Sequence, residues 1–253
     1  MSNKRGVSLC IKRYVPITVI AFFLFAATAS GALTPDEAIK KLKDGNKRYV
    51  TGKTTHPNQT QARRQETIGG QHPFASVLAC SDSREPVEII FDQGIGDIFV
   101  IRVAGNVVDT IEVGSIEYGV AHLDTPVVLV LGHTHCGAVA AAVKDAQVQG
   151  SIVPLVENII PAVYTAREKD PKLTGAKLMA RATEENIWLS IENLISRSSI
   201  IREEIKDGKL QVLGAIYNIE NGKIDWLGPH PEQAQLLKSY IPIPESSLLS
   251  EKQ

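Results

Sequence analysis

The sequence has little of what marks a nucleic-acid-binding or disulfide-rich protein. Its 253 residues include only three cysteines, charged residues make up 22%, and the formal net charge is -1. Nucleic-acid phosphates are bound by clusters of Lys and Arg, and no such cluster stands out, so we expect no nucleic-acid partner. Residues 33–253 also lack internal repeats and low-complexity tracts, which predicts a single domain there.

The longest hydrophobic run lies near the N-terminus, over residues 15–29. Basic residues, among them Lys4 and Arg13, precede it, and small residues follow it. The run is shorter than the roughly 20 residues that a membrane-spanning helix needs. This layout predicts a signal peptide over residues 1–32, cleaved after Ala29 or Ala32, with a retained anchor as the alternative. We therefore expect an exported protein, periplasmic or secreted, that is free of the membrane once the signal is removed.

The cysteines leave two interpretations open. Cys10 precedes the hydrophobic run and would leave with the signal peptide, whereas Cys80 and Cys136 would stay in the mature chain. In an oxidising compartment two cysteines commonly form a disulfide, so a disulfide competes with metal binding as their role.

Short apolar runs alternate with helical spacings along the mature chain. Strands are expected over residues 74–79, 98–103, 126–131 and 210–217, and Asn221-Gly222 predicts a hairpin turn to a further strand over 223–227. Helices are expected from Thr34 and over residues 85–91, 110–123, 138–143, 153–168 and 175–197. This alternation predicts an α/β fold with a central, mostly parallel sheet, in which four parallel strands and an antiparallel edge strand are flanked by helices.

Three residues that can bind a metal stand at the ends of predicted strands. Cys80 ends the first strand, and His133 and Cys136 follow the third. Ligands of open α/β sheets gather beyond the carboxyl ends of the strands, so these side chains meet if the two strands are neighbours. Two thiolates and an imidazole are a donor set of catalytic zinc and leave a fourth position for water or substrate. The His133-x-x-Cys136 spacing favours zinc over a disulfide.

Each of these residues has a plainer interpretation as well. A lone histidine such as His133 is more often a hydrogen-bonded core residue, and we interpret His135 as a neighbour of the ligands. Asp82 and Arg84, spaced i and i+2, can pair through two parallel hydrogen bonds. The alternative is that Asp82 or Ser83 caps the helix that begins near Pro86.

Cys80-x-Asp82-x-Arg84 followed by His133-x-x-Cys136-Gly137 resembles the β-class carbonic anhydrases, and the similarity covers roughly residues 34–227. The resemblance implies one Zn²⁺ per chain, held by the two cysteines and the histidine. It also implies that the domain catalyses reversible hydration of carbon dioxide to bicarbonate by a zinc-bound hydroxide. The resemblance further implies that an Asp82–Arg84 dyad orients that hydroxide. The N-terminal helices are expected to pack on a partner in a homodimer or dimer of dimers.

The same resemblance assigns substrate contacts to Gln71, Phe99, Ala104 and Gly137, the first two reaching in from the neighbouring subunit. In some members the aspartate replaces water on zinc in a closed, inactive form, a switch linked to a pocket around a tryptophan. Here Val77 stands three residues before Cys80. We therefore expect an open resting site with Asp82 on Arg84, and Asp82 as a metal ligand only in a closed form.

Two other functions compete with this one. The same zinc site could hydrolyse carbonyl sulfide or carbon disulfide. A non-enzymatic binding module held by a structural zinc or a disulfide is the second alternative. Structural zinc usually has four protein ligands, and only Asp82 offers a local fourth.

Overall fold

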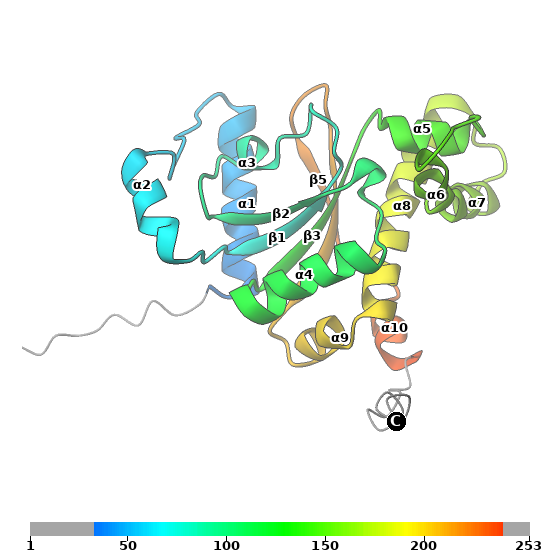
Figure 1. Cartoon of the computed structure of the whole chain (residues 1–253). Helices are drawn as coiled ribbons and strands as arrows, with labels where there is room; N and C mark the ends of the chain where they lie inside the picture. The colour runs from blue at the N-terminus through cyan, green and yellow to red at the C-terminus, as the bar shows by residue number, and fades with distance from the viewer. Residues whose placement is uncertain (1–32, 240–253) are drawn as a thin grey trace, which may run out of the picture. The chain divides into compact units, whose positions relative to one another are not determined.

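A five-stranded sheet forms the centre of the protein in the computed structural model, which describes residues 33–239 (Figure 1). The strands are β1 (Ala75–Ala79), β2 (Ile98–Arg102), β3 (Val127–His133), β4 (Gln211–Tyr217) and β5 (Ile224–Gly228). Their order in the sheet is β2-β1-β3-β4-β5, and only β5 runs antiparallel to its neighbour. The predicted α/β sheet is confirmed. The predicted signal peptide, with its cleavage positions at Ala29 and Ala32, lies outside the described residues.

Helices connect and cover the strands. They are α1 (Pro35–Val50), α2 (Gln61–Glu66), α3 (Val87–Ile90), α4 (Thr110–Leu123), α5 (Gly137–Val143), α6 (Ile152–Glu157), α7 (Ile160–Lys169), α8 (Gly175–Arg197), α9 (Ser199–Lys206) and α10 (Gln233–Ser239), with short 3₁₀ turns η1 (Thr67–Gly69) and η2 (Ala104–Asn106). None of the helices among residues 33–239 has the length and hydropathy needed to cross a bilayer.

The helix expected over residues 153–168 is wrong as a single element. It divides into α6 and α7, and Pro161 lies in the first turn of α7. A proline is tolerated there because the first turn needs no N–H donor, whereas inside a continuous helix it would remove a hydrogen bond and clash with the preceding turn. Helices α9 and α10 were not expected from the sequence.

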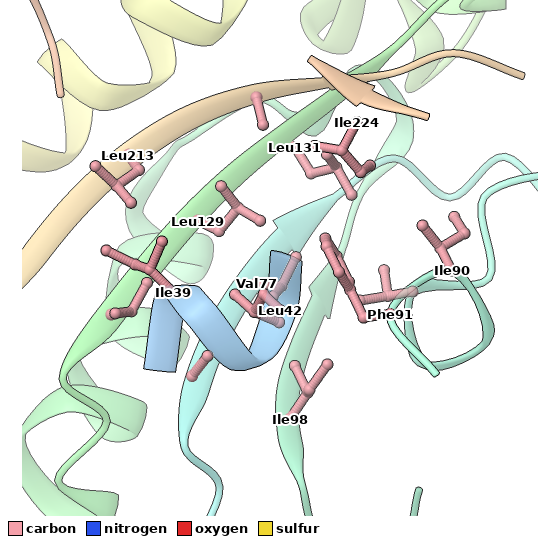
Figure 2. Close-up of a cluster of buried hydrophobic side chains, with 14 of the residues drawn as sticks. Ile39, Leu42, Val77, Ile90, Phe91, Ile98, Leu129, Leu131, Leu213 and Ile224 are labelled. Carbon is pink, nitrogen blue, oxygen red and sulfur yellow. The ribbon is translucent and has the colours of Figure 1, made fainter. Parts of the chain in front are cut away.

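Helices α1 and α3 cover one face of the sheet. Ile39 and Leu42 of α1 point onto Val77 and Leu129 of the central strands, as Figure 2 shows. Thr34 caps α1 through its side chain and Pro35 occupies the first turn, as the sequence predicts. The start of the helix is thus set by its own capping residues.

The opposite face packs against α4, α8 and α9. Its buried cluster joins Leu78 and Val130 of the sheet to Ile116 of α4 and Ile191 of α8. Strands β1 and β3 are buried along their whole length, which explains why they read as continuous apolar runs rather than alternating ones. The domain is thus a three-layer α/β/α arrangement.

Asp92 fastens the segment after α1 to the end of α3. Its carboxylate accepts hydrogen bonds from Arg48 Nε, from the N–H and hydroxyl of Thr55, and from the N–H of His56. Burial opposes ionisation, but these hydrogen bonds outweigh it and lower the pKa of Asp92 to about 2. This aspartate clasp holds together parts of the chain that lie 44 positions apart.

Sheet register brings the ends of three strands together. Ala79, the last residue of β1, pairs with Leu131 of β3 on one side and with Arg102 of β2 on the other. Cys80 and His133 therefore follow those pairs at the same carboxyl edge of the sheet, as expected for neighbouring parallel strands.

Candidate metal centre

Two sulfurs and one imidazole converge at the carboxyl edge of the sheet. Cys80 follows β1, His133 ends β3, and Cys136 occupies the position just before α5. The ligating atoms of the three residues all lie within 4.8 Å of one another, and all three side chains are buried. Both thiols are free, so the disulfide interpretation does not describe this structure.

The orientation of His133 leaves one ring nitrogen for a metal. Its Nδ1 lies 2.9 Å from the carbonyl oxygen of Thr134, which only accepts hydrogen bonds, so Nδ1 carries the proton. Nε2 then keeps its lone pair, is buried, and has no hydrogen-bond partner among the described residues. A buried acceptor without a partner costs free energy, whereas a metal ion satisfies it. The residues therefore fit a zinc ion.

The two thiols are electrostatically coupled. A hydrogen bond from Cys136 lowers the pKa of Cys80 despite burial, with help from His133 and the N–H of Gly105. The same hydrogen bond raises the pKa of Cys136. Cys80 is thus the sulfur that ionises more readily, and the thiolate is the form of cysteine that binds a metal.

Asp82 and Arg84 form a bidentate pair beside the triad. Arg84 donates from Nε to Oδ1 of Asp82 at 2.9 Å and from Nη2 to Oδ2 at 2.7 Å. These hydrogen bonds hold the pKa of Asp82 well below its ordinary range. The Oδ2 atom of Asp82 lies 3.9 Å from Nε2 of His133. The helix-cap alternative is wrong, because α3 has no side-chain cap.

Arg102 braces the backbone of the same loop. It donates from Nε to the carbonyl oxygen of Cys80 at 2.9 Å and from Nη2 to that of Asp82 at 2.6 Å. Sequence reasoning gave this residue no role at the site. The sequence did contain a signal for it: Arg102 is a charged residue at the carboxyl end of an otherwise apolar strand, which is the edge of the sheet where ligands bind.

Glu85 lies behind Cys80. It is fully buried, and its Oε2 accepts a hydrogen bond from the N–H of Cys80 at 2.9 Å. Burial raises the pKa of Glu85 to about 8, and a nearby cation would lower it. Sequence reasoning placed this residue only in a short helix, because nothing in the local pattern distinguishes a buried glutamate from a solvated one.

Comparison with known proteins identifies the family and the fold. The sequence profile of the carbonic anhydrase family matches residues 75–224. A Mycobacterium tuberculosis protein named carbonic anhydrase 2 is 40% identical over 193 residues, covering 75% of this chain and 91% of the relative. Two crystal structures of fungal β-carbonic anhydrases also match this chain. That from Aspergillus fumigatus has a TM-score of 0.65 at 28% identity and covers 80% of this chain and 94% of its own. The structure from Sordaria macrospora has a TM-score of 0.62 at 29% identity, and the match covers 73% of this chain and 94% of the fungal chain.

The chain belongs to the β-carbonic anhydrases. It is therefore a carbonic anhydrase enzyme, and the family's dependence on zinc agrees with the cysteine and histidine cluster.

Two of the four residues that the sequence assigns to substrate lie next to the candidate metal ligands of this carbonic anhydrase. Ala104 begins η2, one position before Gly105, whose N–H lies 3.2 Å from the sulfur of Cys80. Gly137 is the first residue of α5 and directly follows Cys136.

The other two lie apart from the cluster within the chain. Gln71 is exposed in the loop before β1. Phe99 of β2 pairs in register with Ser76, near the start of β1, and packs its ring 6.0 Å from that of Tyr118. Both placements are at a distance from the carboxyl edge, so any role for them in substrate binding would require a partner subunit.

His135 does not join the cluster. Its backbone has a positive φ of 58°, and its exposed ring lies 3.2 Å from the carboxylate of Glu220. The interpretation of His135 as a neighbour of the ligands agrees with this contact. A cavity of about 1260 Å³ begins at His135 and Thr134 and extends along α5, α7 and α8, but none of the three candidate ligands lines it.

Proposed function

We propose that this carbonic anhydrase binds one zinc ion per chain through Cys80, His133 and Cys136 and interconverts carbon dioxide and bicarbonate. The observation that carries the proposal is the buried convergence of two sulfurs and an unpartnered imidazole nitrogen. Three protein ligands of this kind leave a fourth tetrahedral position for water or substrate. Soft thiolates select zinc over hard cations such as magnesium.

Asp82 and Arg84 would act on the reacting water. Zinc bound at the three ligands supplies a Lewis acid that makes a water molecule acidic enough to serve as the nucleophile. Asp82 is ionised and lies beside His133, so it can accept a hydrogen bond from that water and direct a lone pair toward the carbon of carbon dioxide. The proton released in hydration leaves to solvent.

Arg84 would keep Asp82 in this role. Both carboxylate oxygens of Asp82 are engaged by the guanidinium, which also donates to the carbonyl oxygen of His135 at 3.2 Å. A carboxylate held in this way is drawn away from the metal position. This supports an open resting site, with Asp82 as a metal ligand confined to an inactive closed form.

The substrate pocket would be completed by a second subunit. We propose a homodimer or dimer of dimers in which the partner supplies Gln71 and Phe99, while Ala104 and Gly137 line the path to the metal from within the chain. The structures from Sordaria macrospora are described as tetrameric, which supports this arrangement. Light scattering of the purified protein tests the assembly, and a monomeric active enzyme would contradict it.

Export is a separate proposal that rests on residues 1–32. Mass determination of the protein recovered from the periplasm or medium is expected to show an N-terminus just after Ala29 or Ala32. Recovery of the full-length chain in the membrane fraction would favour the retained anchor.

Metal content and hydration rate together test the enzymatic proposal. We expect one zinc per chain and stopped-flow hydration of carbon dioxide that a chelator abolishes and added zinc restores. Thiol titration of the metal-free protein is expected to find two free cysteines in the mature chain. A disulfide without zinc would favour a structural module, and faster turnover of carbonyl sulfide or carbon disulfide would reassign the substrate.

A further inference from the structure

Helix α8 is tied to the 3₁₀ turn η2 beside the metal centre. Asn186 of α8 is 1% exposed and donates from Nδ2 to the carbonyl oxygen of Gly105 at 2.7 Å. A carbonyl oxygen only accepts hydrogen bonds, so the amide of Asn186 must face it with its nitrogen. These two residues lie 81 positions apart in the chain.

The residue that Asn186 holds is in direct contact with a proposed zinc ligand. The N–H of Gly105 points at the sulfur of Cys80, with the two atoms 3.2 Å apart. Gly105 has a φ of 74°, and an added Cβ would lie 2.7 Å from Cδ1 of Ile159. The position therefore requires glycine.

Glycine creates a difficulty at this position. It is the residue with the most conformational freedom, so its N–H is the least well fixed by the local chain. An N–H that must point at one sulfur needs an anchor from elsewhere. The buried hydrogen bond from Asn186 to the carbonyl side of the same residue supplies that anchor.

We propose that Asn186 is a positioning residue for the metal ligand Cys80: it fixes Gly105 so that the Gly105 N–H donates to the sulfur. A hydrogen bond to a thiolate stabilises the charged sulfur that a metal requires and fixes its orientation. Asn186 thereby tunes the thiolate from a helix that contributes no ligand. The inference rests on the proposed function, since it takes Cys80 to be a zinc ligand.

Ser190, one turn further along α8, is a matched control. It is 2% exposed and donates its hydroxyl to the carbonyl oxygen of Asn106 at 2.9 Å, in the same 3₁₀ turn. The N–H of Asn106, however, donates to the carbonyl oxygen of Val103 and not to a sulfur. Loss of the Ser190 hydrogen bond thus loosens the turn without touching the contact to Cys80.

The test compares Asn186→Ala and Asn186→Leu with Ser190→Ala in the full protein. Ala removes the whole amide group, and Leu replaces it with an apolar side chain of similar size, so neither can donate to Gly105. We expect both Asn186 variants to lose zinc to a chelator about 10- to 100-fold faster than the wild type. In the cobalt-substituted enzyme the thiolate-to-cobalt charge-transfer band is expected to shift, because it reports electron density on sulfur. Ser190→Ala should leave the band unchanged and zinc loss within about twofold.

A second measurement does not depend on the variants folding. In wild-type protein loaded with cadmium-113, the Gly105 amide proton should show a scalar coupling to the metal through the hydrogen bond to sulfur. Absence of that coupling would overturn the proposal, as would an unshifted charge-transfer band in both Asn186 variants or equal shifts in Ser190→Ala. Failure of the proposed function looks different: the wild type would bind no zinc, or would keep it in Cys80→Ser.

Discussion

Two of the protein's Asp–Arg pairs, Asp92–Arg48 of the clasp and Asp82–Arg84 of the dyad, differ in what surrounds them. In the clasp, Asp92 has a side chain with no exposed surface, and Arg48 reaches it from 44 positions away. At the metal centre, the side chain of Asp82 is 17% exposed, and Arg84, itself 51% exposed, lies two residues on. Both aspartates have a pKa below the ordinary value. Both are pairs of a carboxylate and a guanidinium, but the clasp joins residues far apart in the sequence and the dyad joins residues of one loop.

Connectivity decides what each pair contributes. The clasp joins separate segments and also binds the N–H groups of Thr55 and His56, so breaking it leaves a buried charge and frees the chain. The dyad pairs neighbours in one loop, where an exposed ion pair adds little to stability. Asp82 can instead present an oxygen toward the site of His133. We propose that the clasp serves the fold and the dyad serves the reaction.

The largest effect is expected from removing a metal ligand, which leaves the dyad with nothing to act on. His133→Ala should abolish zinc binding and reduce hydration to the uncatalysed rate, because two thiols alone cannot complete the ligand set. Plasma mass spectrometry and stopped-flow rates measure both. His135→Ala is the matched control, since His135 lies in the same turn and is exposed. Equal losses in the two variants would show that the turn, and not the imidazole of His133, holds the metal.

Asp82→Asn removes the charge of the dyad but keeps its shape. We expect the variant to retain zinc and to lose about 100-fold in kcat, because the amide no longer accepts the hydrogen bond of the reacting water at an anionic oxygen. Its free energy of unfolding should stay within about 1 kcal/mol of the wild type. Full turnover in this variant would remove Asp82 from the reaction.

Asp92→Asn is the reciprocal change in the clasp. It should lower the free energy of unfolding by about 3 kcal/mol, because Arg48 loses its partner and a buried network is broken. The kcat per folded molecule should match the wild type. Urea unfolding and rates corrected for active sites separate the two quantities. A large fall in kcat with an unchanged free energy of unfolding would mean that the clasp, and not only the dyad, serves the reaction.

The clasp also predicts how stability depends on pH. The pKa of Asp92 is lowered from 3.8 to about 2, so its contribution is present above pH 4 and is lost as pH falls toward 2. The loss amounts to roughly 2 kcal/mol. Unfolding of Cys80→Ser compared with Cys80→Ser/Asp92→Asn between pH 6 and 2 isolates this loss, because neither protein is expected to release zinc. Parallel curves would mean that Asp92 does not titrate with folding.

The sequence predicted most of the sheet because its signals are local. Strands β1 and β3 read as apolar runs and are buried throughout, and Cys80 and His133 followed from their strand ends. The break between α6 and α7 was missed because Pro161 can lie either in the first turn of a new helix or at a kink in one long helix, and the sequence does not distinguish the two. Glu85 and Asn186 were missed for another reason: their roles depend on contacts that only the folded chain creates, in the case of Asn186 across 81 positions.

The smallest effect is expected from Arg84→Lys, which keeps the charge of the dyad and removes its geometry. Arginine holds both oxygens of Asp82 with a planar fork, whereas the lysine ammonium is a single point of contact. Asp82 should remain ionised but rotate more freely, so kcat should fall about tenfold with zinc retained. Arg48→Lys is the control, and it should change the free energy of unfolding without changing kcat. If Arg84→Lys matches Asp82→Asn in kcat, the fork itself positions the carboxylate. If the kcat of Arg84→Lys matches that of the wild type, a positive charge at position 84 is enough to keep Asp82 active, and the dyad differs from the clasp only in location.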